Sequence, residues 1–388
     1  MKKVKIFFHV DKLHPVGGPA GYLWNLMQGL NHVKHMDIEI SFLPQSVATI
    51  EDNQKLRSML PNRIKDVRRA WKFANYLKRE SSLNYDLSNY DAVHFHSTED
   101  LYFNRKVLKN YKGKVILTSH TPCAPYKEII GRLNPLDYKL FKRRIDQLEQ
   151  MDCYAFKRAD YIIFPCEEAE EPYYHTWEQY SDIRDGSKYR FMPTGIMECT
   201  AKHSRKEIRE KYAIPENAFL ISYVGRHNEI KGYGDLKEIG EKLLKDRDVY
   251  FLIAGAEEPM AGLEDKHWIE VGWTNDPHSL IAAADVFVLP NRETYFDLIL
   301  LEVMSLGVPI VLSNTGGNKF FRQYSLMGMR YYTSMPEAIE QLLYFKRMQD
   351  KDREIAKNEL KALYYREYSL EMFANRYIET LESIFEES

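Results

Sequence analysis

The stretch "ADVFVLPNRETYFDLILLEVMSLGVPIV", residues 284–311, joins a strand, a loop, a helix and a second strand in one short passage. The apolar run that opens it is typical of a buried strand. Asp297 can cap a helix that begins at Leu298, and Gly307 followed by Pro309 ends that helix. A strand, a helix and a strand in this order predict a parallel sheet with crossover helices.

The same alternation of apolar runs and helical segments continues through the whole chain. Runs such as "VKIFFHV" and "KVILTSH" are followed, after "YRFMPTGIME", by a new cycle that includes "AFLISYVG" and "VYFLIAG". A chain of 388 residues is long enough for two domains. We therefore predict an α/β protein with two Rossmann-like αβα domains, residues 1–195 and 196–369, and a C-terminal helix at 370–388 that completes the first domain. Ser369 can cap this last helix. Ligands of such sheets bind beyond the carboxyl ends of the strands, so the loops there are the candidate site.

The composition is that of an ordinary soluble globular protein, with 44% hydrophobic and 28% charged residues. No apolar run reaches the roughly 18 residues that a membrane-spanning helix needs. The opening stretch contains no secretory hydrophobic region, because Asp11 and His14 interrupt it. The four cysteines are too irregularly spaced for a disulfide framework or for paired zinc ligands. We expect a cytoplasmic protein with reduced thiols.

Charge is divided unevenly along the chain. Residues 1–200 carry 30 Lys and Arg against 25 Asp and Glu, and the remainder carries 24 against 31. Much of the basic excess lies in residues 62–80 and 138–144, where basic and aromatic residues mix. Such segments can rest on the anionic inner face of the cell membrane, or they can be solvated helix faces. The sequence leaves peripheral membrane contact open, and we expect no nucleic-acid partner.

Two loops that follow strands combine glycine with groups suited to anions. Gly17 and Gly18 precede a helix start, where backbone N–H groups can face a negative ligand. Gly225 closes a strand and is followed by Arg226 and Lys231, which together could hold a diphosphate. A plain glycine turn and ordinary surface charge are the alternatives.

The helix that begins at Leu298 and the loop that follows the next strand add further candidate residues. Glu302 lies about one turn inside a helix that is apolar nearly all round, so its carboxylate must find hydrogen-bond donors. The hydroxyls of a ribose would serve, and so would a structural arginine or backbone N–H. Gly316 and Gly317 again place glycines before a helix, where N–H groups could face an anion.

Three histidines stand at strand ends in the first half of the chain. His94 and His96 share a strand face by their spacing of two, which suits a metal, but no third ligand is apparent. We therefore expect no metal there. His120 is the better functional candidate, because it ends its strand on the side where ligands of parallel sheets bind.

Taken in order, these motifs resemble those of the retaining glycosyltransferases of family 4, which have the GT-B fold. The resemblance rests on the glycine pair of the first loop, "SH" after a middle strand, "GR" and "KG" separated by four residues, and "LLEVMSLGVPIV" before "TGG". It covers almost the whole chain and is strongest over residues 193–318. It implies two domains that face each other across a cleft. The second domain would hold a UDP- or GDP-linked sugar donor, and the acceptor would enter from the first domain. No metal or other cofactor is implied.

The resemblance also implies roles for particular residues. Arg226 and Lys231 would neutralise the departing diphosphate, because fixed cations stabilise the charge that develops on a leaving group. Glu302 would hold the ribose, and His120 would contact the donor sugar. Glu293 would complete the catalytic set. The remaining donor-binding residues are Gly17, Gly18, Gly225, Thr294, Tyr295, Phe296, Asp297, Leu298, Gly316 and Gly317.

The loop before the helix departs from the family pattern. Counting back from Glu302 by the family's spacing reaches Thr294, and Glu293 stands one place earlier. Tyr295 and Asp297 occupy positions where the family has small glycines, and an aspartate pointing inward would repel phosphate. Either the loop shifts to bring Glu293 inward, which we favour, or Thr294 makes a weaker sugar contact.

Two functions follow from these observations. The first is a glycosyltransferase of the hexosyltransferase type that acts on a glycan, lipid-linked or protein acceptor in the synthesis of cell-surface polysaccharide or glycoconjugate. The second is a catalytically weak GT-B pseudoenzyme that binds an acceptor or serves as a partner of another transferase. The altered loop favours the second, whereas Arg226, Lys231 and Glu302 favour the enzyme.

Overall fold

The computed structural model describes residues 1–9, 13, 15, 18–33, 37–43, 68, 71, 73–75, 86–131, 133, 135–257 and 259–387. Within these residues, none of the helices combines the length and the apolar character that crossing a membrane requires. Two sequence predictions, on Gly17 and on most of the basic segment 62–80, lie outside the described residues.

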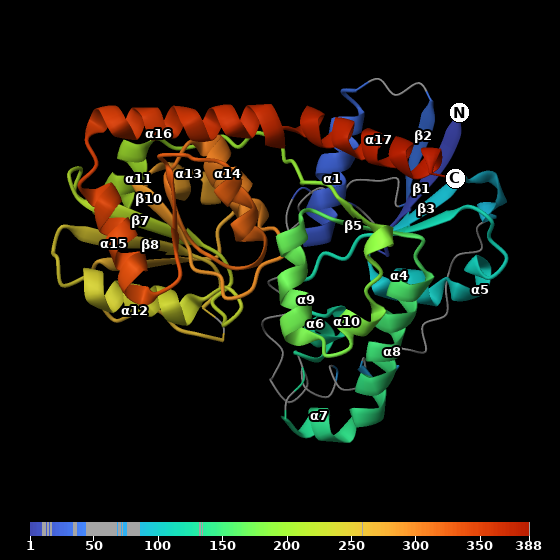
Figure 1. The fold of residues 1–388 in the computed structure, drawn as a ribbon. Helices are drawn as coiled ribbons and strands as arrows, with labels where there is room; N and C mark the ends of the chain where they lie inside the picture. Colours follow the sequence, from blue (N-terminus) through green and yellow to red (C-terminus); the bar gives the residue numbers. More distant parts are fainter. Residues whose placement is uncertain are drawn as a thin grey trace. The chain divides into compact units, whose positions relative to one another are not determined.

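The first half of the chain forms a parallel six-stranded sheet in the order β2-β1-β3-β4-β5-β6 (Figure 1). Its strands are β1 (Lys2–Phe7), β2 (Ile38–Leu43), β3 (Ala92–Phe95), β4 (Lys114–Leu117), β5 (Tyr161–Phe164) and β6 (Tyr189–Phe191). Its helices are α1 (Gly18–Leu30), η2 (Leu87–Asn89), α4 (Thr98–Phe103), α5 (Arg105–Leu108), α6 (Pro125–Ile130), α7 (Pro135–Leu140), α8 (Lys142–Arg158), α9 (Glu171–Thr176), α10 (Tyr180–Ile183) and η4 (Gly186–Lys188). All residues of β3 and β5 are buried, as expected for central strands covered on both faces.

The second half forms another parallel six-stranded sheet, in the order β12-β11-β10-β7-β8-β9. Its strands are β7 (Phe219–Val224), β8 (Val249–Ala254), β9 (Trp268–Gly272), β10 (Val286–Leu289), β11 (Ile310–Ser313) and β12 (Met329–Tyr332). Its helices are α11 (Arg205–Lys211), α12 (Tyr233–Leu243), α13 (Pro277–Ala282), α14 (Leu298–Leu306), η5 (Gly316–Gln323), α15 (Met335–Lys346), α16 (Asp350–Leu363) and η6 (Tyr364–Tyr368). The predicted strand, helix and strand of the opening passage are therefore β10, α14 and β11.

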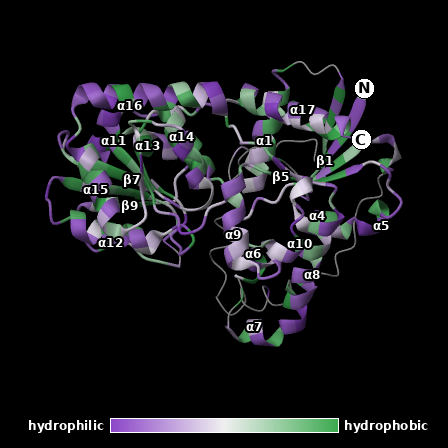
Figure 2. Ribbon diagram, viewed as in Figure 1, coloured by the Kyte–Doolittle hydropathy of each residue, from purple (hydrophilic) through white to green (hydrophobic). Residues whose placement is uncertain are grey.

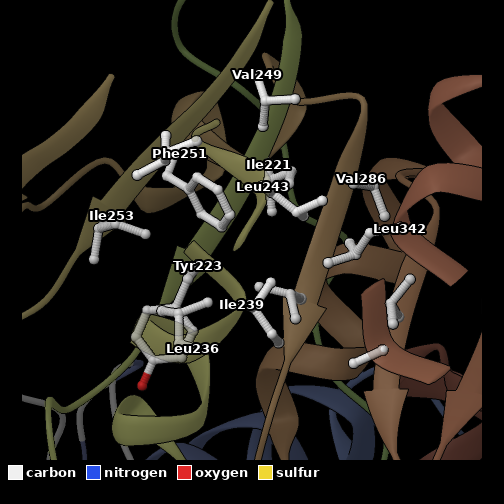
Figure 3. Packing of buried hydrophobic residues seen from close by; sticks show 14 of the residues in the cluster. Ile221, Tyr223, Leu236, Ile239, Leu243, Val249, Phe251, Ile253, Val286 and Leu342 are labelled. Atoms are coloured by element: carbon white, nitrogen blue, oxygen red, sulfur yellow. The ribbon is translucent and has the colours of Figure 1, made fainter. Parts of the chain in front are cut away.

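Successive side chains of β7 serve opposite faces of this second sheet. Ile221 and Tyr223 pack in one cluster with Ile239 of α12 and Leu342 of α15 (Figure 3), whereas Leu220 joins α11 and α13 in a second cluster. Burying each such side chain stabilises the fold by about 1.5–3 kcal/mol. Figure 2 shows hydrophobic residues on β7, inside this unit, and hydrophilic residues over much of α16.

Contacts divide the chain into two compact units. The first unit comprises Met1–Pro165, Pro172–Met192 and Ala374–Ser388, and the second comprises Cys166–Glu171 and Pro193–Phe373. The division thus falls inside α17 (Leu370–Glu386), and the short helix η3 (Glu167–Glu170) groups with the second unit. In the first unit, Tyr377 of α17 bonds to His94 of β3, with Oη and Nδ1 2.9 Å apart.

The helix ends follow the predicted signals at two of three positions. Gly307 ends α14 with a left-handed φ of 73°, and Ser369 caps α17 by accepting a hydrogen bond from Met372 N at 3.5 Å. Asp297 occupies the N-cap position of α14, but its side chain makes no capping hydrogen bond. The prediction that Asp297 caps this helix is therefore wrong, because its carboxylate is used elsewhere.

Candidate functional site

Two loops at the carboxyl end of the second sheet are bound tightly to each other. The loop after β7 turns at Gly232, whose φ is 64°, and a Cβ there would lie 1.7 Å from the carbonyl oxygen of Pro290. Only glycine fits this position. Arg292 N and Glu293 N, from the loop after β10, donate to Ile230 O at 3.0 and 3.4 Å. These contacts fix Lys231, which stands between them, against the loop that leads into α14.

The Lys231 side chain is held at the start of α14. Its ammonium pairs with the carboxylate of Asp297, and Asn291 Nδ2 donates to the same carboxylate at 2.8 Å. Burial alone would raise the pKa of Asp297, but the Lys231 charge and the bonds from Lys231 and Asn291 outweigh burial and hold that pKa below its ordinary value. Asp297 therefore carries a full negative charge, and an incoming phosphate must compete with it for Lys231.

The first turn of α14 retains unpaired donors. Because Asp297 points to Lys231, it leaves the backbone N–H groups of Leu298 and Ile299 without an acceptor among the described residues. The start of a helix carries partial positive charge as well as these donors. Lys231 and the start of α14 thus combine into a site suited to an anion.

Arg226 is exposed at the start of the loop that follows β7. Its backbone carbonyl accepts a hydrogen bond from Tyr223 Oη at 2.9 Å, and its guanidinium contributes to the low pKa of Asp297. Gly225, directly before it, donates to Ala254 O at 3.0 Å, and a Cβ at Gly225 would approach Tyr223 Oη to 2.7 Å. Among the described residues, the Arg226 guanidinium has no hydrogen bond or ion pair, so it can meet a ligand, while Gly225 packs against Tyr223 of β7.

Gly316 and Gly317 have a structural reason to be glycine. A Cβ on Gly316 would lie 2.1 Å from Thr294 O, and a Cβ on Gly317 would lie 2.0 Å from Tyr295 O. Gly317 N also donates to Thr294 O at 3.1 Å. The side chains of Thr294, Tyr295 and Phe296 are buried, and the Phe296 ring packs against Phe321 at 5.2 Å between centroids. The loop at 294–296 therefore turns its backbone carbonyls toward Gly316 and Gly317. The side chain of Glu293, directly before this loop, is half-buried.

A carboxylate already faces the N–H of this glycine loop. Glu171, which follows η3, accepts from Gly316 N at 3.2 Å and from Thr315 Oγ1 at 3.4 Å, and it forms an ion pair with Lys319. The sequence analysis missed Glu171 and Lys319. The cluster of glutamates after β5, "EEAEE", was the available signal, but nothing in it indicates a partner so distant in the chain.

Glu302 is paired with a histidine. Its Oε2 lies 3.1 Å from His278 Nε2, and both side chains remain partly exposed. Hydrogen bonds to the Cys199 side chain and to Glu302 raise the pKa of His278 to about 10, so this imidazole is protonated near neutral pH. Cys199, His278 and Glu302 also offer ligand atoms within 4.8 Å of one another, an arrangement that could hold a metal ion. The sequence analysis did not identify Cys199 or His278.

Three histidines of the first unit, the buried His94 and His96 and the half-buried His120, form a neutral cluster. His96 Nδ1 lies 3.0 Å from His120 Nε2, and Tyr22 of α1 packs on the His120 ring at 4.7 Å. His94 uses both ring nitrogens, toward Tyr377 and, at 2.8 Å, toward Thr118 Oγ1, so it has no free nitrogen for a metal. Burial lowers the pKa of His94 and of His120 to about 3.

At the first glycine loop, only Gly18 lies among the described residues. It is the first residue of α1, and a Cβ placed on it would meet nothing within 4 Å. The space beside this helix start is therefore open, in contrast to the space beside Gly316 and Gly317 of the second unit.

Comparisons with known proteins agree with this architecture. Residues 218–343 match the family described as "Glycosyl transferases group 1". The chain is similar to UDP-Gal:alpha-D-GlcNAc-diphosphoundecaprenol alpha-1,3-galactosyltransferase of Escherichia coli, with 26% identity over 66% of this chain and 64% of that protein, slightly under two thirds of its length. It is also similar to the O-antigen biosynthesis glycosyltransferase WclY of Escherichia coli, with 21% identity over 95% of this chain and 96% of that protein.

Among solved structures, Anabaena HepE in complex with UDP-glucose aligns over 99% of this chain and 100% of that chain, with a TM-score of 0.63 and 13% identity. These matches confirm the predicted GT-B fold. They also confirm the predicted class of enzyme, since residues 218–343 match the family model and the relatives are glycosyltransferases.

Proposed function

We propose that the protein is a retaining glycosyltransferase of family 4 that moves a sugar from a UDP- or GDP-linked donor to a glycan, lipid-linked or protein acceptor in the synthesis of cell-surface polysaccharide. The names of its relatives support this, because one acts on a diphosphoundecaprenol-linked acceptor and another serves O-antigen biosynthesis. The proposal includes metal-independent catalysis in the cytoplasm, with contact to the inner face of the cell membrane.

One observation carries the proposal. Lys231 lies at the start of α14, where the N–H groups of Leu298 and Ile299 have no acceptor among the described residues. A nucleoside diphosphate that leaves a sugar carries charge on oxygens that such donors and cations stabilise without reorganising. Arg226, exposed and close enough to act on the charge of Asp297, would add a second cation.

Three other predicted residues would bind the ribose or the sugar of the donor. Glu302, oriented by His278, would accept hydrogen bonds from the ribose hydroxyls. His120 is half-buried, and the loss of hydration lowers its pKa to about 3, so its neutral ring would donate to or accept from a sugar hydroxyl without adding charge. Glu293 is assigned to the donor sugar in preference to Thr294, whose side chain is buried.

The charge on Asp297 has a definite consequence in this mechanism. A diphosphate brings negative charge toward a carboxylate that is already ionised, so binding requires Lys231 to turn from Asp297 to the phosphate. Asn291 keeps a hydrogen bond to Asp297 while this exchange takes place. The pair would thus hold the lysine in place between catalytic cycles.

The test has two stages. Thermal unfolding is measured with UDP, GDP and ADP, because a ligand that binds only the folded protein raises the melting temperature. Products of a nucleotide-sugar panel with lipid-linked and soluble glycan acceptors are then identified by mass analysis. A shift with one nucleotide and a product from its sugar derivative support the proposal. A shift without any product would instead support the binding-only pseudoenzyme, and no shift with any nucleotide would overturn the donor site.

A further inference from the structure

The short helix α7 turns its apolar face outward and its acidic residue inward. Its two leucines, Leu136 and Leu140, are 67% and 70% exposed, whereas its aspartate, Asp137, is buried. Residues four apart lie on the same side of a helix, so the two leucines form one outward stripe. A soluble helix normally turns its apolar stripe inward.

Unpaired cations surround these leucines. Lys139 lies on α7, and Lys142 and Arg143 begin α8 directly after it. All three side chains are exposed, and none has a carboxylate partner among the described residues. We refer to Leu136, Lys139, Leu140, Lys142 and Arg143 as the α7 tip. Figure 1 shows α7 at the end of α8 that lies farthest from the first sheet, and Figure 2 shows hydrophobic residues on it beside hydrophilic ones.

We infer that the α7 tip docks on an anionic lipid bilayer. The leucines would enter the boundary between headgroups and acyl chains, and the three cations would contact lipid phosphates. Tyr138, 47% exposed on the same helix, has the apolar ring and polar hydroxyl that suit this boundary. The inference adds to the proposed function the surface that would bring the enzyme to a membrane-held acceptor.

The charge of the tip decides between a membrane and a second copy of the chain. An apolar patch could also be covered by the same patch of another copy, in a two-fold contact. Such a contact would bring Lys139, Lys142 and Arg143 of one copy near the same residues of the other, and like charges repel. An anionic surface instead attracts both features of the tip.

The test measures co-sedimentation of the whole protein, without donor or acceptor, with vesicles of phosphatidylglycerol and phosphatidylcholine in equal parts, and with vesicles of phosphatidylcholine alone. Binding is expected to the anionic vesicles and to weaken as salt is raised. The double variant Leu136→Ser with Leu140→Ser should lower the partition coefficient about tenfold or more. The triple variant Lys139→Gln, Lys142→Gln and Arg143→Gln should abolish the preference for anionic vesicles.

A matched control comes from α16 of the second unit, where Ile355 and Lys351 are exposed one turn apart. The variant Ile355→Ser with Lys351→Gln should bind vesicles like the wild type. Equal binding by the leucine variant and the wild type, or a shift of the leucine variant from dimer to monomer with no change in vesicle binding, would overturn the inference. Transfer to a soluble acceptor is assayed in parallel. Loss of vesicle binding by the leucine variant with transfer intact supports the inference, whereas a wild-type protein that transfers sugar but does not bind anionic vesicles refutes only the membrane surface and leaves the proposed function standing.

Discussion

At the carboxyl end of the first sheet, the buried His94 and His96 and the half-buried His120 pack together as neutral groups. The carboxyl end of the second sheet carries paired charges instead, Lys231 with Asp297 and His278 with Glu302. Two sheets that are both six-stranded and parallel thus end in opposite electrostatic environments. Ionic ligands are expected at the second end and uncharged hydroxyls at the first, and the following predictions test this difference.

Acidification should produce the largest effect, in the first unit. The pKa of His94 and of His120 is lowered by burial to about 3, from 6.5, so the unfolded chain binds more protons between these values. The stability that depends on them is complete above pH 6.5 and is lost as the pH falls toward 3, by several kcal/mol in total. Hydrogen exchange in a peptide that spans β3, corrected for intrinsic rates, should accelerate over this range.

Asp152 supplies the control for this prediction. Burial raises the pKa of Asp152 to about 7, so the folded first unit takes up this proton on acidification and is stabilised by it. Replacing Asp152→Asn removes that opposing contribution and should steepen the acid loss. Unchanged protection of β3 down to about pH 4 would show that the histidines are not held neutral by burial.

The Lys231→Ala variant should have the next largest effect. Removing the cation that meets the leaving diphosphate should lower kcat/KM by about a hundredfold, close to 3 kcal/mol. The measurement is steady-state transfer with the donor that the product panel identifies. Lys242→Ala, an exposed lysine on α12 of the same unit, is the matched control and should keep the wild-type rate. A wild-type rate in Lys231→Ala would remove this lysine from the mechanism.

Gly317 of the second unit and Gly18 of the first should respond differently to alanine. Gly317→Ala places a Cβ 2.0 Å from Tyr295 O, and the displacement of packed backbone should cost about 2 kcal/mol of the free energy of unfolding. Gly18→Ala meets open space and should leave that free energy within about 0.5 kcal/mol of the wild type. Urea unfolding of both variants measures the difference, and equal stabilities would contradict the packing described for Gly317.

Glu302→Gln should have the smallest effect of the series. Loss of the carboxylate that faces the ribose should raise the donor KM about tenfold, near 1.4 kcal/mol, with a smaller change in kcat. The exposed Glu238→Gln on α12 is the control. An unchanged donor KM would show that Glu302 contacts only His278 and does not bind the ribose.

The same variant should also change the pH dependence of stability. His278 has its pKa raised to about 10, so its contribution is complete below its ordinary 6.5 and is lost as the pH rises through 10. Without the Glu302 charge this contribution is smaller, and the melting temperature of the variant should fall less between neutral and alkaline pH than that of the wild type.

The order of elements could be predicted from the sequence because each depends on local pattern. The apolar runs predicted both parallel sheets, and Gly307 and Ser369 marked helix boundaries by rules that involve only neighbouring residues. Asp297 looked like a cap by the same rules. Its carboxylate instead pairs with Lys231, because a full opposite charge binds it more strongly than a backbone N–H does.

The parts of the site that escaped prediction depend on pairings between distant segments. Glu171 reaches the N–H of Gly316, and His278 reaches Glu302 from another helix, and no local pattern encodes either contact. The glycine pair of the second unit was predicted to face an anion. The structure adds a packing reason for both glycines, since their neighbours are the carbonyl oxygens of Thr294 and Tyr295.

The central claim is that Lys231 exchanges Asp297 for the diphosphate of the donor. Isothermal titration with the nucleoside diphosphate that gives the largest thermal shift tests it most directly, in the wild type, Lys231→Ala and Asp297→Asn. The account predicts that Lys231→Ala weakens binding at least tenfold, near 1.4 kcal/mol, whereas Asp297→Asn, which releases the lysine and removes a repelling charge, strengthens it. Equal losses of affinity in the two variants would contradict the account and would make the ion pair a purely structural contact.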